Sequence, residues 1–217
     1  MSRLDVYTAV HKMQRARLFD LTVEAGKTDP ADTITTARLA AAVDALVAEL
    51  VAHAEHEERF IHPLLRHTAP ALADTLDTAH LELDARLRQL RDVASNHAAS
   101  PGDPNALYRA LAAFTAAYLD HLDLEEGAAL PAMWEGCTDE ELTGILVSFK
   151  GSRSDTENLT SLLAQLATLN PTEITRMASV GLGQVEVSDV AEILATLLNP
   201  RQLGALRCSL TPSSSGM

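Results

Sequence analysis

Four long stretches of the chain repeat apolar residues in alternating steps of three and four, the pattern of an α-helix that buries one face. Gly26 and the segment around Pro30 separate the first two stretches, and the turn residues 100–104 separate the last two. The pattern predicts an all-α, up-down four-helix bundle with knobs-into-holes packing. The four predicted helices cover about residues 4–25, 36–67, 70–97 and 105–136.

The chain beyond the fourth stretch reads as shorter amphipathic helices. Thr138 followed by Glu141 is a capping-box signature for the first of them. We predict these additional C-terminal helices over about residues 138–149, 155–169, 172–180 and 187–198. The domain organisation is then a bundle over 1–136, a helical extension over 137–210 and a disordered tail over 211–217. The extension either caps the bundle, shapes the entrance to its pocket or forms a homodimer interface, and the sequence leaves these alternatives open.

Each of the four apolar seams carries one histidine, and two seams also carry a glutamate one turn later. A buried ionisable group costs several kcal/mol unless it is paired or bound to a metal. Because all four helices carry such a group at a similar height, we infer that these histidine and glutamate side chains lie close together. The seam residues are His11, His53, Glu57, His80, His121 and Glu125.

An internal repeat relates the two halves of the predicted bundle. His53 and His121 each begin a His-x-x-x-Glu-Glu segment, and a proline follows each histidine by ten residues, at an offset of 68 residues. His11 aligns with His80 at an offset of 69 residues. The repeat predicts two helical hairpins related by a pseudo-two-fold axis, which places two similar half-sites opposite each other at the bundle centre.

The spacing of these residues suits a site for two metal ions. Residues i and i+4 lie on one helix face, so His53 with Glu57 and His121 with Glu125 form two inward clamps. Imidazole suits iron, and a carboxylate can bridge two metals. The simplest assembly has the two glutamates as bridges and the four histidines as terminal ligands, with coordination positions left open. Iron, manganese or a mixed pair fits these ligand types.

With this ligand pattern, residues 4–134 resemble the hemerythrin-like family, also called the haemerythrin HHE cation-binding domain. The resemblance implies a hemerythrin-type bundle that holds two non-heme iron ions, bridged by carboxylates and by an oxo or hydroxo group. Oxygen-carrying hemerythrins have a second histidine on the third helix, where this chain has Asp84. Asp84 is therefore either a seventh ligand or a residue that leaves one iron more open. Glu125 fits the bacterial spacing of the family, and Glu126 occupies the longer register of the carriers.

Two irons with unequal coordination, or one iron with an open coordination position, favour chemical turnover of a bound oxygen species over purely reversible oxygen transport. The first hypothesis is a protein that binds or turns over dioxygen, peroxide or nitric oxide, with catalase-like or peroxidase-like activity. The second is a diiron oxidase or oxygenase that acts on a small organic substrate, and the third is an iron or oxygen sensor. The residues do not decide whether the chain is an enzyme, and they identify no catalytic residue.

Composition and charge restrict the possible binding partners and the cellular location. The net charge is −13 and the pI about 4.9, so the surface repels nucleic acids and anionic lipids. Cys137 and Cys208 form no metal-binding, redox or disulfide pattern. No signal-peptide pattern and no apolar run of ~20 residues is present. We expect a cytoplasmic protein with neither nucleic-acid nor membrane partners.

Other polar residues near the seams have supporting or surface roles in this prediction. Glu58 and Glu126 are expected to form helix-face ion pairs or to support the ligands rather than bind metal. Tyr7 and Tyr118 either pack in the core or donate a hydrogen bond to a bound oxygen species. The remaining histidines are off the seams and are expected to face solvent: His56, His62, His67 and His97.

Overall fold

The computed structural model describes residues 3–99, 102–181 and 194–210, with the backbone alone at 178–181, 209 and 210. All regular structure in these ranges is helical, which confirms the predicted all-α class with additional C-terminal helices. The chain divides into two compact units, residues 1–152 and 153–217. The division predicted after residue 136 stays a prediction. The tail 211–217 and most of the helix expected over 187–198 lie outside the described residues.

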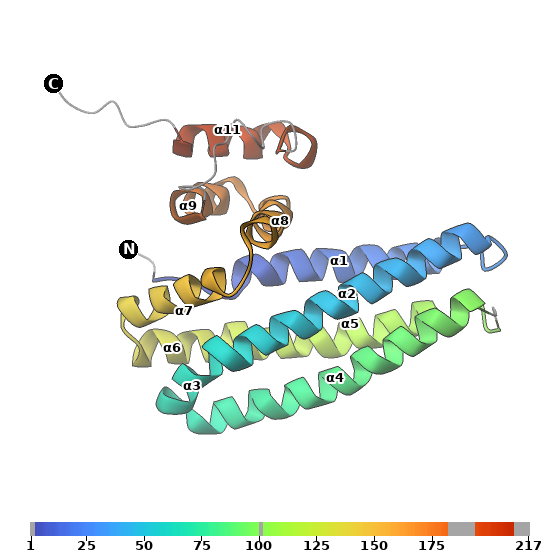
Figure 1. Ribbon diagram of the computed structural model, residues 1–217, viewed down its shortest axis with the longest axis horizontal. Helices are drawn as coiled ribbons and strands as arrows, with labels where there is room; N and C mark the ends of the chain where they lie inside the picture. The colour runs from blue at the N-terminus through green and yellow to red at the C-terminus, as the bar shows by residue number, and fades with distance from the viewer. Residues whose placement is uncertain (1–2, 100–101, 182–193, 211–217) are drawn as a thin grey trace. The chain divides into compact units, whose positions relative to one another are not determined.

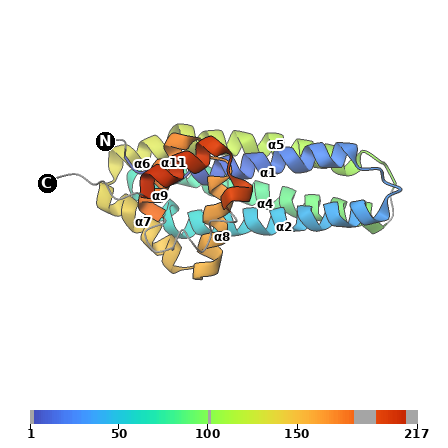
Figure 2. The same ribbon diagram turned by 90° about the horizontal axis from the view of Figure 1, so that it is seen from above.

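Four long helices form the bundle: α1 (Thr8–Lys27), α2 (Thr33–Phe60), α4 (Pro70–Ala99) and α5 (Ala106–Leu124) (Figure 1). α1 packs against α2 and α5, and α4 packs against the same two helices. Figure 2 shows α1 beside α5 and α2 beside α4. The arrangement confirms the predicted up-down bundle. α1 begins at Thr8 rather than at Leu4, and in the turn before it the Asp5 carboxylate accepts the N–H groups of Tyr7 and Thr8 at 3.0 and 2.9 Å.

Both helices that carry a His-x-x-x-Glu segment are interrupted just beyond it, so the prediction of unbroken helices was wrong there. α2 is followed by the short helix α3 (His62–Thr68). α5 passes through one π-helical turn, η1 (Glu125–Ala129), into α6 (Leu130–Gly136). Pro63 and Pro131 explain both interruptions, because a proline has no N–H to donate to the preceding turn. π-helical turns of this kind are frequent at functional sites.

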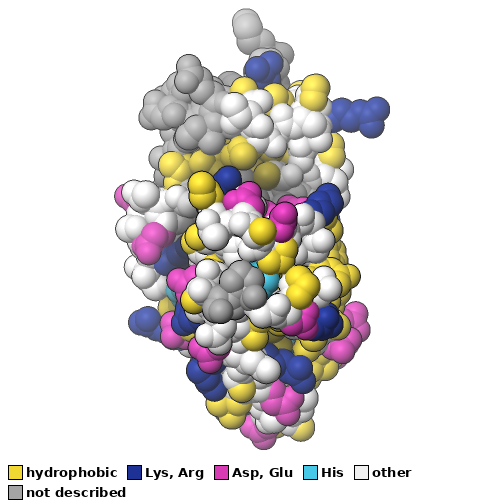
Figure 3. All heavy atoms as spheres, turned by 90° about the vertical axis from the view of Figure 1, so that its right-hand side faces the viewer, with side chains coloured by type: hydrophobic (Ala, Val, Ile, Leu, Met, Phe, Trp, Pro, Cys, Tyr) yellow, Lys and Arg dark blue, Asp and Glu magenta, His cyan; other side chains and the backbone are white. Residues whose placement is uncertain are grey.

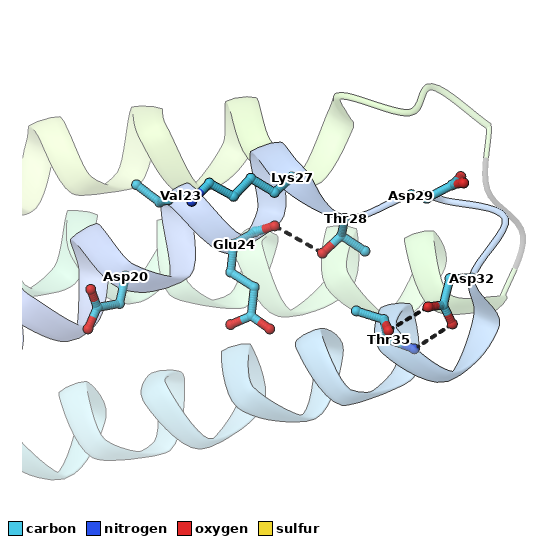
Figure 4. A pocket seen from close by; sticks show the side chains of 8 residues that line it. All are labelled: Asp20, Val23, Glu24, Lys27, Thr28, Asp29, Asp32 and Thr35. Atoms are coloured by element: carbon cyan, nitrogen blue, oxygen red, sulfur yellow. Dashed lines mark hydrogen bonds between the residues drawn. The ribbon is translucent and has the colours of Figure 1, made fainter.

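The connection between α1 and α2 is defined by local hydrogen bonds (Figure 4). Asp32 caps α2 by accepting the N–H groups of Ile34 and Thr35 at 3.1 and 3.0 Å, while the Thr28 hydroxyl donates to the Glu24 carbonyl at 2.9 Å. A mainly acidic groove of about 530 Å³ surrounds it. None of its described side chains is both buried and unpaired. At this end of the bundle, acidic and basic side chains are interspersed (Figure 3).

The buried interior of the bundle has a polar layer between two apolar clusters. On α2, Leu50 belongs to one cluster and Ile61, just beyond the helix, to the other; His53 and Glu57 lie between them in the sequence. The first cluster includes the fully buried residues Leu18, Leu39, Leu46, Leu90, Leu107 and Leu111. The second includes Tyr7, Leu65, Leu76, Leu130, Met133 and Leu142. The packed apolar seams on both sides of the polar layer hold its residues at the same height of the bundle.

The helix after the bundle, α7 (Asp139–Gly151), begins with the predicted capping box. The Thr138 hydroxyl accepts the Glu141 N–H at 3.2 Å, and the Glu141 carboxylate accepts the Thr138 N–H at 2.7 Å. α7 packs against α2, where the rings of Phe149 and His56 lie 4.8 Å apart. α7 therefore forms part of the first compact unit.

The second unit contains α8 (Asp155–Leu166), α9 (Pro171–Gly181) and α11 (Pro200–Leu210). α9 packs against α11, and the buried Gln202 amide donates to the Leu169 carbonyl at 2.8 Å. The sequence patterns predicted α8 and α9 but missed α11. None of the described helices is both long enough and apolar enough to cross a membrane. The expected cytoplasmic location and the homodimer alternative stay predictions.

Candidate metal centre

Six of the predicted ligands form two overlapping groups of donor atoms in the polar layer. Within each group, one donor atom per residue lies within 4.8 Å of all the others. Glu57 belongs to both groups, so two cations bound there would share its carboxylate. The first group is His11, His53 and Glu57, and the second is Glu57, His80, His121 and Glu125.

The two clamps have the geometry that their i,i+4 spacing predicts. His53 Nε2 lies 3.0 Å from Glu57 Oε1, and His121 Nε2 lies 3.2 Å from Glu125 Oε1. The heptad phase turns both glutamates inward, where they are 2% and 0% exposed. Each clamp therefore presents a nitrogen and a carboxylate oxygen to the bundle interior.

The two lone histidines reach across the bundle to the opposite clamp. His11 Nε2 lies 3.3 Å from Glu125 Oε2, and His80 Nε2 lies 3.5 Å from Glu57 Oε2. Each lone histidine thus approaches the clamp of the other hairpin, as expected for the pseudo-two-fold repeat. The centre is assembled from all four long helices together with the η1 turn.

The carboxylate that follows each clamp glutamate in the sequence supports a lone histidine. His11 Nδ1 lies 2.8 Å from Glu126 Oε1, and His80 Nδ1 lies 3.0 Å from Glu58 Oε1. A carboxylate accepts hydrogen bonds, so each Nδ1 carries the hydrogen and each Nε2 faces the cluster. Glu58 and Glu126 therefore contact the two lone histidines, and their role in supporting metal ligands stays a prediction. Arg15 in turn donates to both oxygens of Glu126, at 2.6 and 3.2 Å.

The lone histidines are protonated at neutral pH in the absence of a metal. Burial lowers the pKa of His11, but the carboxylates of Glu126 and Glu57 outweigh burial and raise it to about 9. Burial also lowers the pKa of His80, and the carboxylates of Glu125 and Glu57 raise it to about 10. A cation that binds both Nε2 atoms must therefore displace protons.

The clamp glutamates are ionised despite their burial. Burial raises the pKa of Glu57, but the nearby His53 and His11 outweigh burial and hold it well below its ordinary value. Burial and the negative charge of Glu57 raise the pKa of Glu125, and the contacts with His121 and the other histidines lower it overall. Two buried carboxylates are thus available to a cation.

The buried atoms of the cluster fit a metal. Nε2 of the histidines and the carboxylate oxygens of Glu57 and Glu125 approach one another at 3.0–3.9 Å. Among the described residues, none of these atoms on His11, His53, His80, Glu57 or Glu125 makes a contact with hydrogen-bond geometry. Buried polar atoms are almost always satisfied in native proteins. A bound cation would satisfy all of these atoms, and imidazole with carboxylate is a donor set that iron accepts.

Two tyrosines flank the cluster. The buried Tyr118 hydroxyl donates to Gln14 Oε1 at 3.1 Å, whereas the Tyr7 hydroxyl is buried without a partner among the described residues. Burial and the negative charges of Glu57 and Glu125 raise the pKa of both hydroxyls well above the ordinary value. Both hydroxyls therefore keep their protons, and the Tyr7 hydroxyl is free to donate one hydrogen bond.

A cavity of about 10 Å³ adjoins the cluster, with Leu50, Leu83 and Tyr118 among its lining residues. Asp84 is half-buried and also lines this cavity, but it belongs to neither group of donor atoms. Asp84 thus lies beside four of the six clustered residues, which line the same cavity, but outside the two donor groups. Its role as a seventh ligand stays a prediction.

Two histidines expected to face solvent are buried, so that prediction was wrong. His62 is fully buried, its Nδ1 lies 2.6 Å from Asp77 Oδ1, and its ring stacks on His80 at 5.0 Å. The break after α2 starts a new helical phase at His62, which Pro63 could have indicated. His97 is 7% exposed because the three-four spacing of α4 continues to it from Ala94. His67 is exposed as predicted, and His56 is partly buried.

A buried set of histidines and carboxylates at the centre of an up-down bundle defines a helical cation-binding protein. The family model described as the hemerythrin HHE cation-binding domain matches residues 2–133, and the chain belongs to this family. This match confirms the resemblance inferred from the ligand pattern. Comparison with the curated proteins and with the solved structures finds no match.

Proposed function

We propose that the cluster is a non-heme diiron centre that binds or turns over dioxygen, peroxide or nitric oxide. The observation that carries the proposal is the sharing of Glu57 by two groups of buried donor atoms. Because the two groups share this carboxylate, they would hold two cations next to each other. His11, His53, His80 and His121 would be the terminal ligands, with Glu125 as the second carboxylate. Two iron ions bound there would supply the redox chemistry.

The chain's own residues would position the site and control its protons. Glu58 and Glu126 fix the ring orientation and tautomer of His80 and His11. The Tyr7 hydroxyl keeps its proton and has no partner among the described residues, so it can donate a hydrogen bond toward an anionic ligand. The apolar clusters on both sides exclude water from the layer.

The size of the adjoining cavity favours small ligands. Its volume of about 10 Å³ is close to that of one water position. Dioxygen, nitric oxide and peroxide are of this order of size, whereas an organic substrate needs a larger cavity. The oxidase or oxygenase alternative is therefore the weaker one. The sensor hypothesis stays a prediction, which a comparison of protease resistance with and without bound metal would test.

The test begins with protein purified without oxygen and loaded with ferrous iron. We expect two iron ions per chain by elemental analysis, and a new near-ultraviolet and visible absorption band when dioxygen is added. Persistence of the band indicates binding, and its decay together with rapid peroxide decomposition indicates turnover.

The His53→Ala, His121→Ala double variant removes one nitrogen from each clamp and should lose stoichiometric iron. His67→Ala, at an exposed position on α3, is the matched control and should keep both iron ions. Full iron binding by the double variant, or an iron content well below two in the wild-type protein, would show that the proposal is wrong.

A further inference from the structure

The pseudo-two-fold repeat relates the ligands of the two halves but is broken beside them. Arg15 and Asp84 are related by the same offset of 69 residues as His11 and His80. Each lies one turn beyond its histidine and on the same helix face. The repeat therefore places opposite charges at equivalent positions of the two half-sites.

In the first half, the charge behind the ligand is neutralised. Glu126 accepts a hydrogen bond from His11 and two from the Arg15 guanidinium. The Arg15 and Glu126 side chains are 25% and 27% exposed, so water screens this pair only in part. The bidentate contact holds Glu126 in place and offsets its negative charge.

In the second half, no arginine or lysine of the described residues pairs with the corresponding carboxylate. Glu58 contacts His80 in the same way, at 3.0 Å, and is 51% exposed. The position that corresponds to Arg15 is occupied by Asp84, which adds a second negative charge beside the cavity next to the cluster.

We propose that Arg15 makes the two cation positions unequal, so that the position at His80 and His121 binds its cation more tightly than the position at His11 and His53. The inference rests on the proposed two-cation centre. We name the two sites the α4–α5 position and the α1–α2 position.

Two effects act in the same direction. A carboxylate that accepts the Nδ1 hydrogen makes an imidazole a better ligand, and the Arg15 ion pair withdraws part of that charge at His11. A guanidinium near a divalent cation also repels it directly, and this repulsion is strong where water is largely excluded. Glu58 and Asp84 instead attract the cation at the α4–α5 position.

Titration of the metal-free protein with Co²⁺, followed by calorimetry and by the visible ligand-field bands, tests the proposal. We expect two binding steps that differ in affinity by about tenfold or more. His121→Ala should remove the tighter step, and His11→Ala should weaken or remove the other.

Variants at Arg15 then separate charge from positioning. Arg15→Gln keeps a hydrogen-bond donor for Glu126 without the charge, and should strengthen the weaker step by about tenfold. Arg15→Lys keeps the charge and should preserve the gap between the steps. Arg17→Gln is the matched control, because Arg17 lies on the same helix, pairs with Glu49 and has an arginine as its repeat equivalent. Circular dichroism checks that each variant is folded.

Each outcome decides between the hypotheses. Two equal steps in the wild-type protein, or an unchanged gap in Arg15→Gln, would overturn the inference while leaving the two-cation centre intact. Weakening of the second step in Arg15→Gln would also overturn it, because Arg15 would then act only as a positioning residue for Glu126. Binding of fewer than two Co²⁺ ions by the wild-type protein would instead count against the proposed function itself.

Discussion

The polar layer and the apolar cluster beside it occupy the same seams of the same helices, yet burial has opposite consequences in the two regions. Leu46 and Glu57 both lie on the buried seam of α2 and are 0% and 2% exposed. Leu46 packs among apolar side chains and gains free energy from leaving water. Both oxygens of Glu57 are buried without a hydrogen-bond partner among the described residues.

This difference indicates that the apolar clusters stabilise the bundle and that the polar layer serves to bind a cation. The apolar clusters supply the folding free energy, and the polar layer reduces it when no cation is bound. Removing one apolar side chain and replacing the polar layer as a whole should therefore change stability in opposite directions. The predictions that follow test this contrast.

The largest expected effect is at Leu46. Leu46→Ala removes three carbon atoms from a fully buried site and should lower the free energy of unfolding of the metal-free protein by about 2–5 kcal/mol. Urea denaturation in the presence of a chelator measures this, and iron stoichiometry at low temperature should stay unchanged. Loss of metal with little loss of stability would contradict the contrast.

The opposite sign is expected when the polar layer is replaced as a whole. Leucine at all six clustered positions removes both signs of charge together and should raise the unfolding free energy of the metal-free protein by about 1–4 kcal/mol. Glu57→Leu alone should instead lower it, because two protonated histidines lose a carboxylate partner. Both variants should lose both cations, because both groups of donor atoms contain Glu57. Exposed Glu55 on the same helix gives the control Glu55→Leu, which should change neither quantity by much.

The stability of the metal-free protein should also depend on pH. The pKa values of His11 and His80 are raised from 6.5 to about 9 and about 10, so their contribution is complete below pH 6.5 and is lost as the pH rises through 9–10. Glu57 and Glu125 have lowered pKa values, so their contribution is present above about pH 4.5 and is lost as the pH falls. The cluster should therefore contribute most between about pH 4.5 and 6.5.

Above pH 6.5, each histidine should lower the unfolding free energy by up to about 1.4 kcal/mol per pH unit. Urea denaturation with a chelator at pH 6, 7.5 and 9 measures this slope. Glu57→Leu should flatten it, because one of the carboxylates that raise the pKa of His11 and His80 is gone. A metal-free protein that became more stable from pH 6 to pH 9 would disagree with the assigned charges.

Periodicity predicted most of the bundle because its helices bury apolar seams of constant spacing. It failed where the backbone changes phase, at the break before His62 and in the η1 turn after Leu124. A seam drawn through either point assigns later residues to the wrong face, so the burial of His62 was missed. Repeat and spacing nevertheless indicated the six clustered residues, because i,i+4 pairs remain on one face within a single helix.

Contacts between side chains of different helices were harder to predict from the sequence. The repeat aligns Arg15 with Asp84, but only the structure shows that Arg15 binds Glu126 and that Asp84 lies beside the cavity rather than among the donor atoms. The helix α11 was missed although it begins at Pro200, since a proline suits the first position of a helix.

The smallest expected effect is at the boundary between the polar layer and the apolar cluster, where Tyr118 donates to Gln14. Tyr118→Phe leaves Gln14 Oε1 buried without its donor, and should lower the unfolding free energy by about 1 kcal/mol. Tyr118→Phe combined with Gln14→Leu removes both polar partners and should recover most of this loss, since Gln14 Nε2 already lacks a partner among the described residues. Iron stoichiometry should be unchanged in both variants if the pair belongs to the apolar cluster. Loss of iron in Tyr118→Phe would instead place Tyr118 within the metal centre and move the boundary between the two regions by one helical turn.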